Sequence, residues 1–144
     1  MTDTATELSL DCTRFIAASP EKLFDAWLDP AMLTRFMLPG ENMSVPEATT
    51  DPRVGGRFLV LMRAGDMDLP HAGTYKTIDR PNQLAFTWES PNSTIEDSTV
   101  TINFEKAEGG TNVHLNHVRF PSEESRDNHN AGWGRILNTL ADCA

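Results

Sequence analysis

The four histidines and the single tyrosine are the side chains with which this sequence could orient a ligand or move a proton. His117 follows Val113 and Leu115 at intervals of two, so in a strand its ring points to the same, predicted inner face. There it could bond a ligand or transfer a proton, because imidazole titrates near neutrality. The alternative, a core histidine bonded to a backbone carbonyl or a neighbour, is favoured because buried polar groups usually have structural partners.

A second group of candidates lies at the middle of the chain. His71, Gly73 and Tyr75 alternate, so a regular strand would place all three on one face. If that face is the inner one, an imidazole and a phenol approach the same pocket as His117. The alternative is that Tyr75 is a core aromatic residue whose hydroxyl reaches the rim, which is the commoner behaviour of buried tyrosines.

The spacing of the histidines argues against a metal site. His114 and His117 are three residues apart in a strand, so their side chains leave opposite faces. His129 lies in a polar stretch before the last helix, and no Cys, His or carboxylate cluster has ligand spacing. The glycine pairs in "GGRF" and "EGGT" are too short for a nucleotide loop, and no GxSxG motif occurs. We therefore expect no metal and no cofactor.

The segments that must position these residues change period along the chain. Residues 8–12 alternate like a strand, and Ser19 and Asp29 each precede a proline, as N-caps of two short helices do. From Met43 the period is two, with turn signals between the runs. In each of four predicted strands, three apolar or aromatic residues share one face. These sets are Phe58, Val60 and Met62; Leu84, Phe86 and Trp88; Val100, Ile102 and Phe104; and Val113, Leu115 and His117.

The last segment returns to helical spacing. Trp133, Ile136, Leu137 and Leu140 form an apolar stripe, and Ser122 is a suitable N-cap. The stretch "EESRDNHNAG" before the stripe is nearly all polar, so we expect the first half of this helix to be solvated or frayed.

These elements predict an α+β fold in one domain, residues 1–144. An antiparallel sheet curls around the long C-terminal helix and buries one face of every strand against it, with two short helices after the first strand. A curled sheet needs bends, and glycine allows backbone conformations that a side chain forbids. We expect Gly55 and Gly56 to mark such a corner.

Charge and composition limit the partners. With 12 Lys and Arg against 21 Asp and Glu the net charge is −9, which disfavours nucleic acid and anionic membrane surfaces. No apolar stretch approaches the roughly 20 residues of a membrane span, and the first residues do not have the pattern of a signal peptide. Cys12 and Cys143 show no paired spacing and indicate reduced thiols, so we expect a cytoplasmic protein.

Five segments carry a family resemblance: "ASPEKLFDAWLDPAML", "DPRVGGRF", "GTYKTIDRPNQLAFTW", "GGTNVHLNH" and "AGWGRILNTL". In this order they resemble the activator of heat-shock-protein-90 ATPase homologue family, part of the START-like (SRPBCC) superfamily with the helix-grip fold of the birch pollen allergen. The resemblance implies a cavity for small apolar molecules between sheet and helix. Many members carry paired tryptophans where this chain has "RFMLP", so Phe36 and Met37 are expected to fill that space and reshape the cavity mouth.

The resemblance also bears on function. Chaperone ATPase stimulation belongs to larger relatives with a separate docking domain, so we expect non-catalytic binding of a small apolar or amphipathic molecule. Two alternatives are a cofactor-free cyclase, isomerase or lyase that uses the same cavity, and a modulator of a chaperone ATPase. A monomer and a homodimer are both compatible with the sequence. The sequence does not specify the identity of the ligand. The expected lining residues are Phe58, Met62, His71, Tyr75, Phe86, Trp88, His117 and Trp133.

Overall fold

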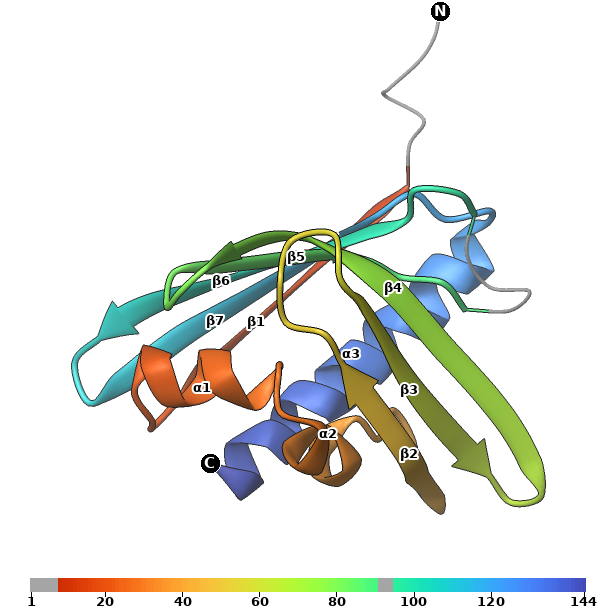
Figure 1. Ribbon diagram of the computed structural model, residues 1–144, viewed down its shortest axis with the longest axis horizontal. Helices are drawn as coiled ribbons and strands as arrows, with labels where there is room; N and C mark the ends of the chain where they lie inside the picture. The colour runs from red at the N-terminus through yellow and green to blue at the C-terminus, as the bar shows by residue number, and fades with distance from the viewer. Residues whose placement is uncertain (1–7, 91–94) are drawn as a thin grey trace, which may run out of the picture.

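Seven strands and three helices make up the part of the chain that the computed structural model describes, residues 8–90 and 95–144. In chain order they are β1 (Ser9–Ile16), α1 (Pro20–Ala26), α2 (Pro30–Phe36), β2 (Met43–Thr50), β3 (Arg57–Ala64), β4 (Met67–Asp79), β5 (Gln83–Thr87), β6 (Thr99–Ala107), β7 (Gly110–Val118) and α3 (Glu123–Cys143). The strands form one antiparallel sheet in the order β1-β7-β6-β5-β4-β3-β2. This curled sheet, with α3 along its inner face and two short helices after β1, confirms the predicted helix-grip fold (Figure 1).

The two short helices begin where the sequence predicts. The Ser19 hydroxyl accepts a hydrogen bond from the Lys22 amide at 3.2 Å, and the Asp29 carboxylate accepts one from the Ala31 amide at 3.0 Å. A proline follows each cap in the first helical turn, where its missing N–H costs no hydrogen bond. The helices thus start from local signals alone.

The core lies between the inner face of the sheet and α3. The inward positions of β6 and β7 are closed to solvent, with Val100, Ile102, Val113 and Leu115 fully buried. From the helix, Trp133, Ile136, Leu137 and Leu140 all project into this core. The period-two and helical patterns in the sequence therefore point to the faces that are buried.

The sequence predicts that Gly55 and Gly56 mark a bend of the sheet. In the structure these two glycines lie in the turn between β2 and β3 instead. Gly55 has a φ of +88°, a left-handed conformation that favours glycine. A Cβ atom on Gly56 would lie 2.1 Å from the carbonyl oxygen of Asp51, so this turn has no room for a side chain.

The corner of the sheet is in β4, which changes its pairing partner. Residues 67–74 pair with β3, whereas the strand from Tyr75 onward pairs with β5, with a register shift after Tyr75. At the change, the Thr74 amide donates to the Thr87 hydroxyl at 2.8 Å. Gly73 is required here, because a Cβ atom would lie 1.9 Å from the Thr87 carbonyl oxygen and 2.6 Å from the Phe58 ring.

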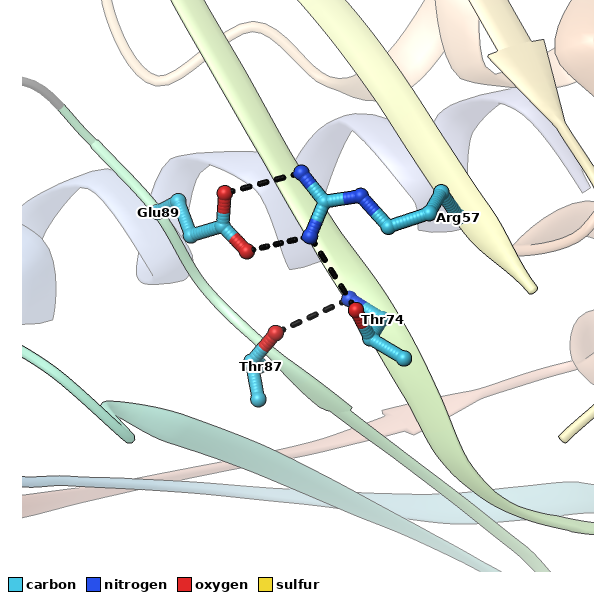
Figure 2. Close-up of polar contacts among 4 residues, drawn as sticks. All are labelled: Arg57, Thr74, Thr87 and Glu89. Carbon is cyan, nitrogen blue, oxygen red and sulfur yellow. Dashed lines mark hydrogen bonds and ion pairs between the residues drawn. The ribbon is translucent and has the colours of Figure 1, made fainter. Parts of the chain in front are cut away.

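An ion pair crosses this corner on the outer face of the sheet. The Arg57 guanidinium donates to both carboxylate oxygens of Glu89 at 2.6 and 2.9 Å, and to the Thr74 hydroxyl at 3.1 Å (Figure 2). The pair therefore joins β3 to the segment after β5 across the backbone of β4. On the inner side of the same corner lie His71 and Trp88, so this local geometry positions the site described next.

Candidate functional site

An open pocket of about 320 Å³ lies between the inner face of the β3–β5 region and the first two thirds of α3. Most of its wall is apolar, with hydroxyl, amide and imidazole groups contributed by α3 and a hydroxyl and an imidazole from the sheet side. Its lining residues are Pro39, Met43, Met62, Leu69, His71, Trp88, Ser90, Ser125, Asn128, His129, Gly132, Trp133 and Ile136. The volume is at the lower end of the range typical of small-molecule sites, roughly 300–1,000 Å³.

The eight residues expected to line a cavity fall into three groups. Met62, His71, Trp88 and Trp133 border the pocket. Phe58, Tyr75 and Phe86 pack against one another instead. The Phe58 ring centroid lies 5.2 Å from that of Phe86 and 5.3 Å from that of Tyr75. Only a gap of about 10 Å³ remains beside them, which is too small for an organic ligand. Burial raises the pKa of the Tyr75 hydroxyl well above its ordinary value.

His117, the eighth residue, lies behind Trp133 and is fully buried. The Trp133 indole N–H donates to Nδ1 of His117 at 3.0 Å, so the neutral ring carries its proton on Nε2. Nε2 then donates to the Ser98 hydroxyl at 2.7 Å, and Ser98 donates to the Val118 carbonyl at 3.2 Å. Burial, with a smaller effect of the His129 charge, lowers the pKa of His117 to about 3. Both nitrogens of this histidine are thus used inside the core.

His71 forms the pocket wall together with Trp88. Their rings stack with centroids 5.0 Å apart at an interplanar angle of 27°. Nδ1 of His71 and the indole nitrogen of Trp88 are both buried and have no hydrogen-bond partner among the described residues. Burial lowers the pKa of His71 to about 4, and a weaker hydrogen-bonding effect of the Leu69 backbone on the ring opposes this shift. The ring is therefore neutral at physiological pH.

The first half of α3 supplies the polar side of the pocket, which the sequence analysis missed. The helix begins at Glu123 with Ser122 as its cap and is not frayed. Outer positions of its first half, such as Glu124 and Asp127, are exposed as expected, whereas Ser125 is buried. Nδ1 of His129 donates to the Ser125 carbonyl at 2.8 Å, and burial lowers the pKa of His129. The signal was in the spacing, because Ser125, His129 and Gly132 continue the stripe of Trp133 and Ile136 at intervals of three and four.

The mouth of the pocket reflects the departure from the family pattern at "RFMLP". Phe36 and Met37 are buried, and the Phe36 ring packs edge-on against Trp27 at 5.1 Å. Pro39, two residues after Met37, borders the pocket, as does Gly132. A Cβ atom on Gly132 would lie 3.1 Å from Cβ of Pro39, so this glycine lets the loop approach the helix closely.

Charged groups lie outside this region. None of the described residues that border the pocket is Lys, Arg, Asp or Glu. His114 leaves the opposite face of the sheet from His117, as predicted, and its Nε2 lies 3.0 Å from the Asp11 carboxylate. Over residues 8–90 and 95–144 there is no group of three or more His, Cys, Asp and Glu that could hold a metal ion. None of the three described helices has the length and apolarity needed to cross a membrane.

The chain matches the model of a known protein family. The model of the family described as Activator of Hsp90 ATPase homolog 1-like protein matches residues 17–144. The chain belongs to this family. Its curled sheet and C-terminal helix have the SRPBCC fold that the sequence resemblance implied. None of the curated proteins compared matches the chain.

Several solved structures superpose closely on the chain. Protein CV1439 from Chromobacterium violaceum has a TM-score of 0.83 at 23% identity, with 94% of this chain and 95% of that chain covered. The AHSA1-like protein from Aeromonas hydrophila has a TM-score of 0.78 at 25% identity, with 94% and 90% covered. Protein NE0264 from Nitrosomonas europaea has a TM-score of 0.78 at 19% identity, with 94% and 92% covered. The fold is thus shared almost from end to end.

Proposed function

We propose that this protein binds a small, mostly apolar molecule in the pocket between the sheet and α3, without catalysing a reaction. The observation that carries the proposal is an open pocket of about 320 Å³ with a mostly apolar wall, between the sheet and α3. Two other open hollows have volumes of about 290 Å³ each, but one is bordered by Lys22, Asp25 and Asp29 and the other by Arg14. The pocket beside α3 is mostly apolar and has no charged residue among its described lining residues, as is typical of a site for a small apolar molecule. Membership of a family with a ligand-binding fold supports the same conclusion.

Binding is preferred to catalysis because of the state of the histidines. An effective general base needs a pKa near the working pH and a nitrogen within reach of the substrate. His117 has neither, since its pKa is about 3 and both of its nitrogens are bonded to Trp133 and Ser98. With a pKa of about 4, His71 is a weak base as well.

The partner and location follow from the same proposal. The small molecule is the partner that we propose, in preference to a chaperone or a second copy of the chain. We place the protein in the cytoplasm, because Cys12 and Cys143 are both unpaired and reducing compartments keep thiols in this state.

The proposal is tested with N-phenyl-1-naphthylamine, an uncharged probe whose fluorescence rises in apolar surroundings. Asn128 borders the pocket from the exposed side of α3, so Asn128→Trp should block the mouth with little disturbance of the core. Ala131→Trp, an equally exposed position of the same helix that does not border the pocket, is the matched control. We expect the Asn128 variant to bind the probe roughly tenfold more weakly or worse, a loss of about 1.4 kcal/mol or more. If both variants bind like the unmodified protein, the pocket is not the binding site.

A further inference from the structure

We propose that the ligand of this pocket is uncharged and carries a hydrogen-bond-accepting oxygen that binds the indole N–H of Trp88. This inference rests on the proposed binding function and adds the chemical class of the ligand. It starts from the polar atoms of the pocket wall that have no partner of their own.

The indole nitrogen of Trp88 is the first of these atoms. An indole N–H is a donor only, and burying a donor without a partner costs free energy. The Trp88 side chain borders the pocket and is 3% exposed, and its nitrogen has no acceptor in the described part of the chain. A carbonyl or ether oxygen of a bound molecule would supply that acceptor.

His71 is the second group at the same place. Its ring stacks on Trp88, and its Nδ1 is also buried without a partner among the described residues. A neutral imidazole nitrogen can either donate or accept, so it can meet a hydroxyl or a second oxygen beside the first. Met62 and Leu69 border the pocket next to this pair. Both nitrogens have less than 1 Å² of exposed surface, so an oxygen reaches them only if such flexible neighbours shift.

The other tryptophans provide an internal comparison. The Trp133 indole N–H is already bonded to His117 at 3.0 Å and is not available to a ligand. Trp27 carries an unpartnered indole nitrogen too, but among the described residues it borders a gap of about 10 Å³, which is too small for a ligand. Trp88 thus combines an unpartnered N–H with a pocket large enough to hold the molecule that would accept from it.

The neutrality of the ligand follows from the charges around the pocket. None of the described lining residues is Lys, Arg, Asp or Glu, and His71 and His129 are held neutral by burial. An anion placed there would lose its hydration without gaining a counter-charge, and a cation would do the same. The net charge of −9 also repels anions as they approach.

Three probes with one skeleton test the inference: 4-phenyl-2-butanone, butylbenzene and 3-phenylpropanoate. Each is titrated at pH 7 while the three indole N–H signals are followed by ¹H–¹⁵N NMR, with assignment by Trp→Phe variants. We expect the ketone to bind about 2- to 12-fold more tightly than butylbenzene, the range of one neutral hydrogen bond. The carboxylate should bind at least about tenfold more weakly than the ketone. The Trp88 signal should move strongly with the ketone, and the Trp27 signal should not.

Matched variants connect the preference to one atom. Trp88→Phe keeps an aromatic ring but removes the N–H, so the ketone and butylbenzene should then bind equally well. Trp27→Phe should keep the preference of the unmodified protein. Equal binding of the two uncharged probes to the unmodified protein, or an unchanged chemical shift of the Trp88 indole N–H with the ketone, would refute the proposed hydrogen bond. Either result would leave the proposed ligand binding itself intact. Tighter binding of the carboxylate would overturn the neutrality. If none of the three probes changed the indole N–H signal of Trp88 or Trp133, which border the pocket, both this inference and the proposed function would be wrong.

Discussion

Acid should destabilise this protein through His117, and the size of the effect can be calculated. The pKa of this histidine is about 3 in the folded chain, against an ordinary value of 6.5. Because the folded pKa is the lower one, the unfolded chain binds more protons between these values, and stability is lost as the pH falls. From pH 7 to pH 5 this histidine alone should reduce the free energy of unfolding by about 2 kcal/mol. For a domain with a total stability of about 5–15 kcal/mol, that is a large fraction.

The variant His117→Leu separates this contribution from the others. At pH 7 it should be less stable than the unmodified protein by about 1–3 kcal/mol, because the Trp133 N–H and the Ser98 hydroxyl lose their partner in the core. Its stability should, however, fall by about 2 kcal/mol less between pH 7 and pH 5. His71 keeps part of the pH dependence in the variant, since burial lowers its pKa to about 4.

Urea unfolding followed by tryptophan fluorescence at pH 7 and pH 5 measures both effects. His114→Leu is the control, because it removes a histidine of the same strand that projects from the outer face. If His117→Leu and the unmodified protein lost the same free energy between the two pH values, His117 would not be buried as a neutral ring. The hydrogen-bond network with Trp133 and Ser98 would then be incorrectly assigned.

The remaining predictions concern two glycines, Gly73 at the corner of the sheet and Gly134 in α3, and the ion pair at the corner. Gly73→Ala should destabilise the protein by about 1–3 kcal/mol or more in urea unfolding, because its Cβ atom would meet the Thr87 carbonyl oxygen at 1.9 Å. Gly134→Ala, in α3 where a Cβ atom has nothing within 4 Å, should instead stabilise it by about 0.4–1 kcal/mol, and a loss in both would contradict the steric argument. Glu89→Gln should cost only about 0.2–1 kcal/mol in thermal unfolding, since both side chains of the Arg57–Glu89 pair are half-exposed, and this small loss should shrink further in high salt.

Local signals in the sequence were sufficient for the elements and their faces. A serine or aspartate before a proline specifies a helix start through hydrogen bonds within three residues, as Ser19 and Asp29 do. Likewise, a period of two specifies which residues of a strand share a side, so the inward position of His117 was predictable. The order from β2 to β7 followed because short connections join neighbouring strands in an antiparallel sheet, whereas the pairing of β1 with β7 is a long-range contact that local signals do not specify.

The tertiary structure decided which inward residues touch open space. Phe58 and Met62 share one face of β3, yet Phe58 packs against Phe86 and Tyr75 whereas Met62 borders the pocket. The difference lies in tertiary packing, because Phe58 pairs with Gly73 just before β4 changes partner, whereas Met62 pairs with Leu69 further from that corner. The periodicity of the sequence predicts to which face of a strand a side chain points. The volume of the pocket depends instead on how side chains from distant segments pack together. For the same reason, the sequence pattern did not show that Ser125, Asn128 and His129 in the polar half of α3 border the pocket.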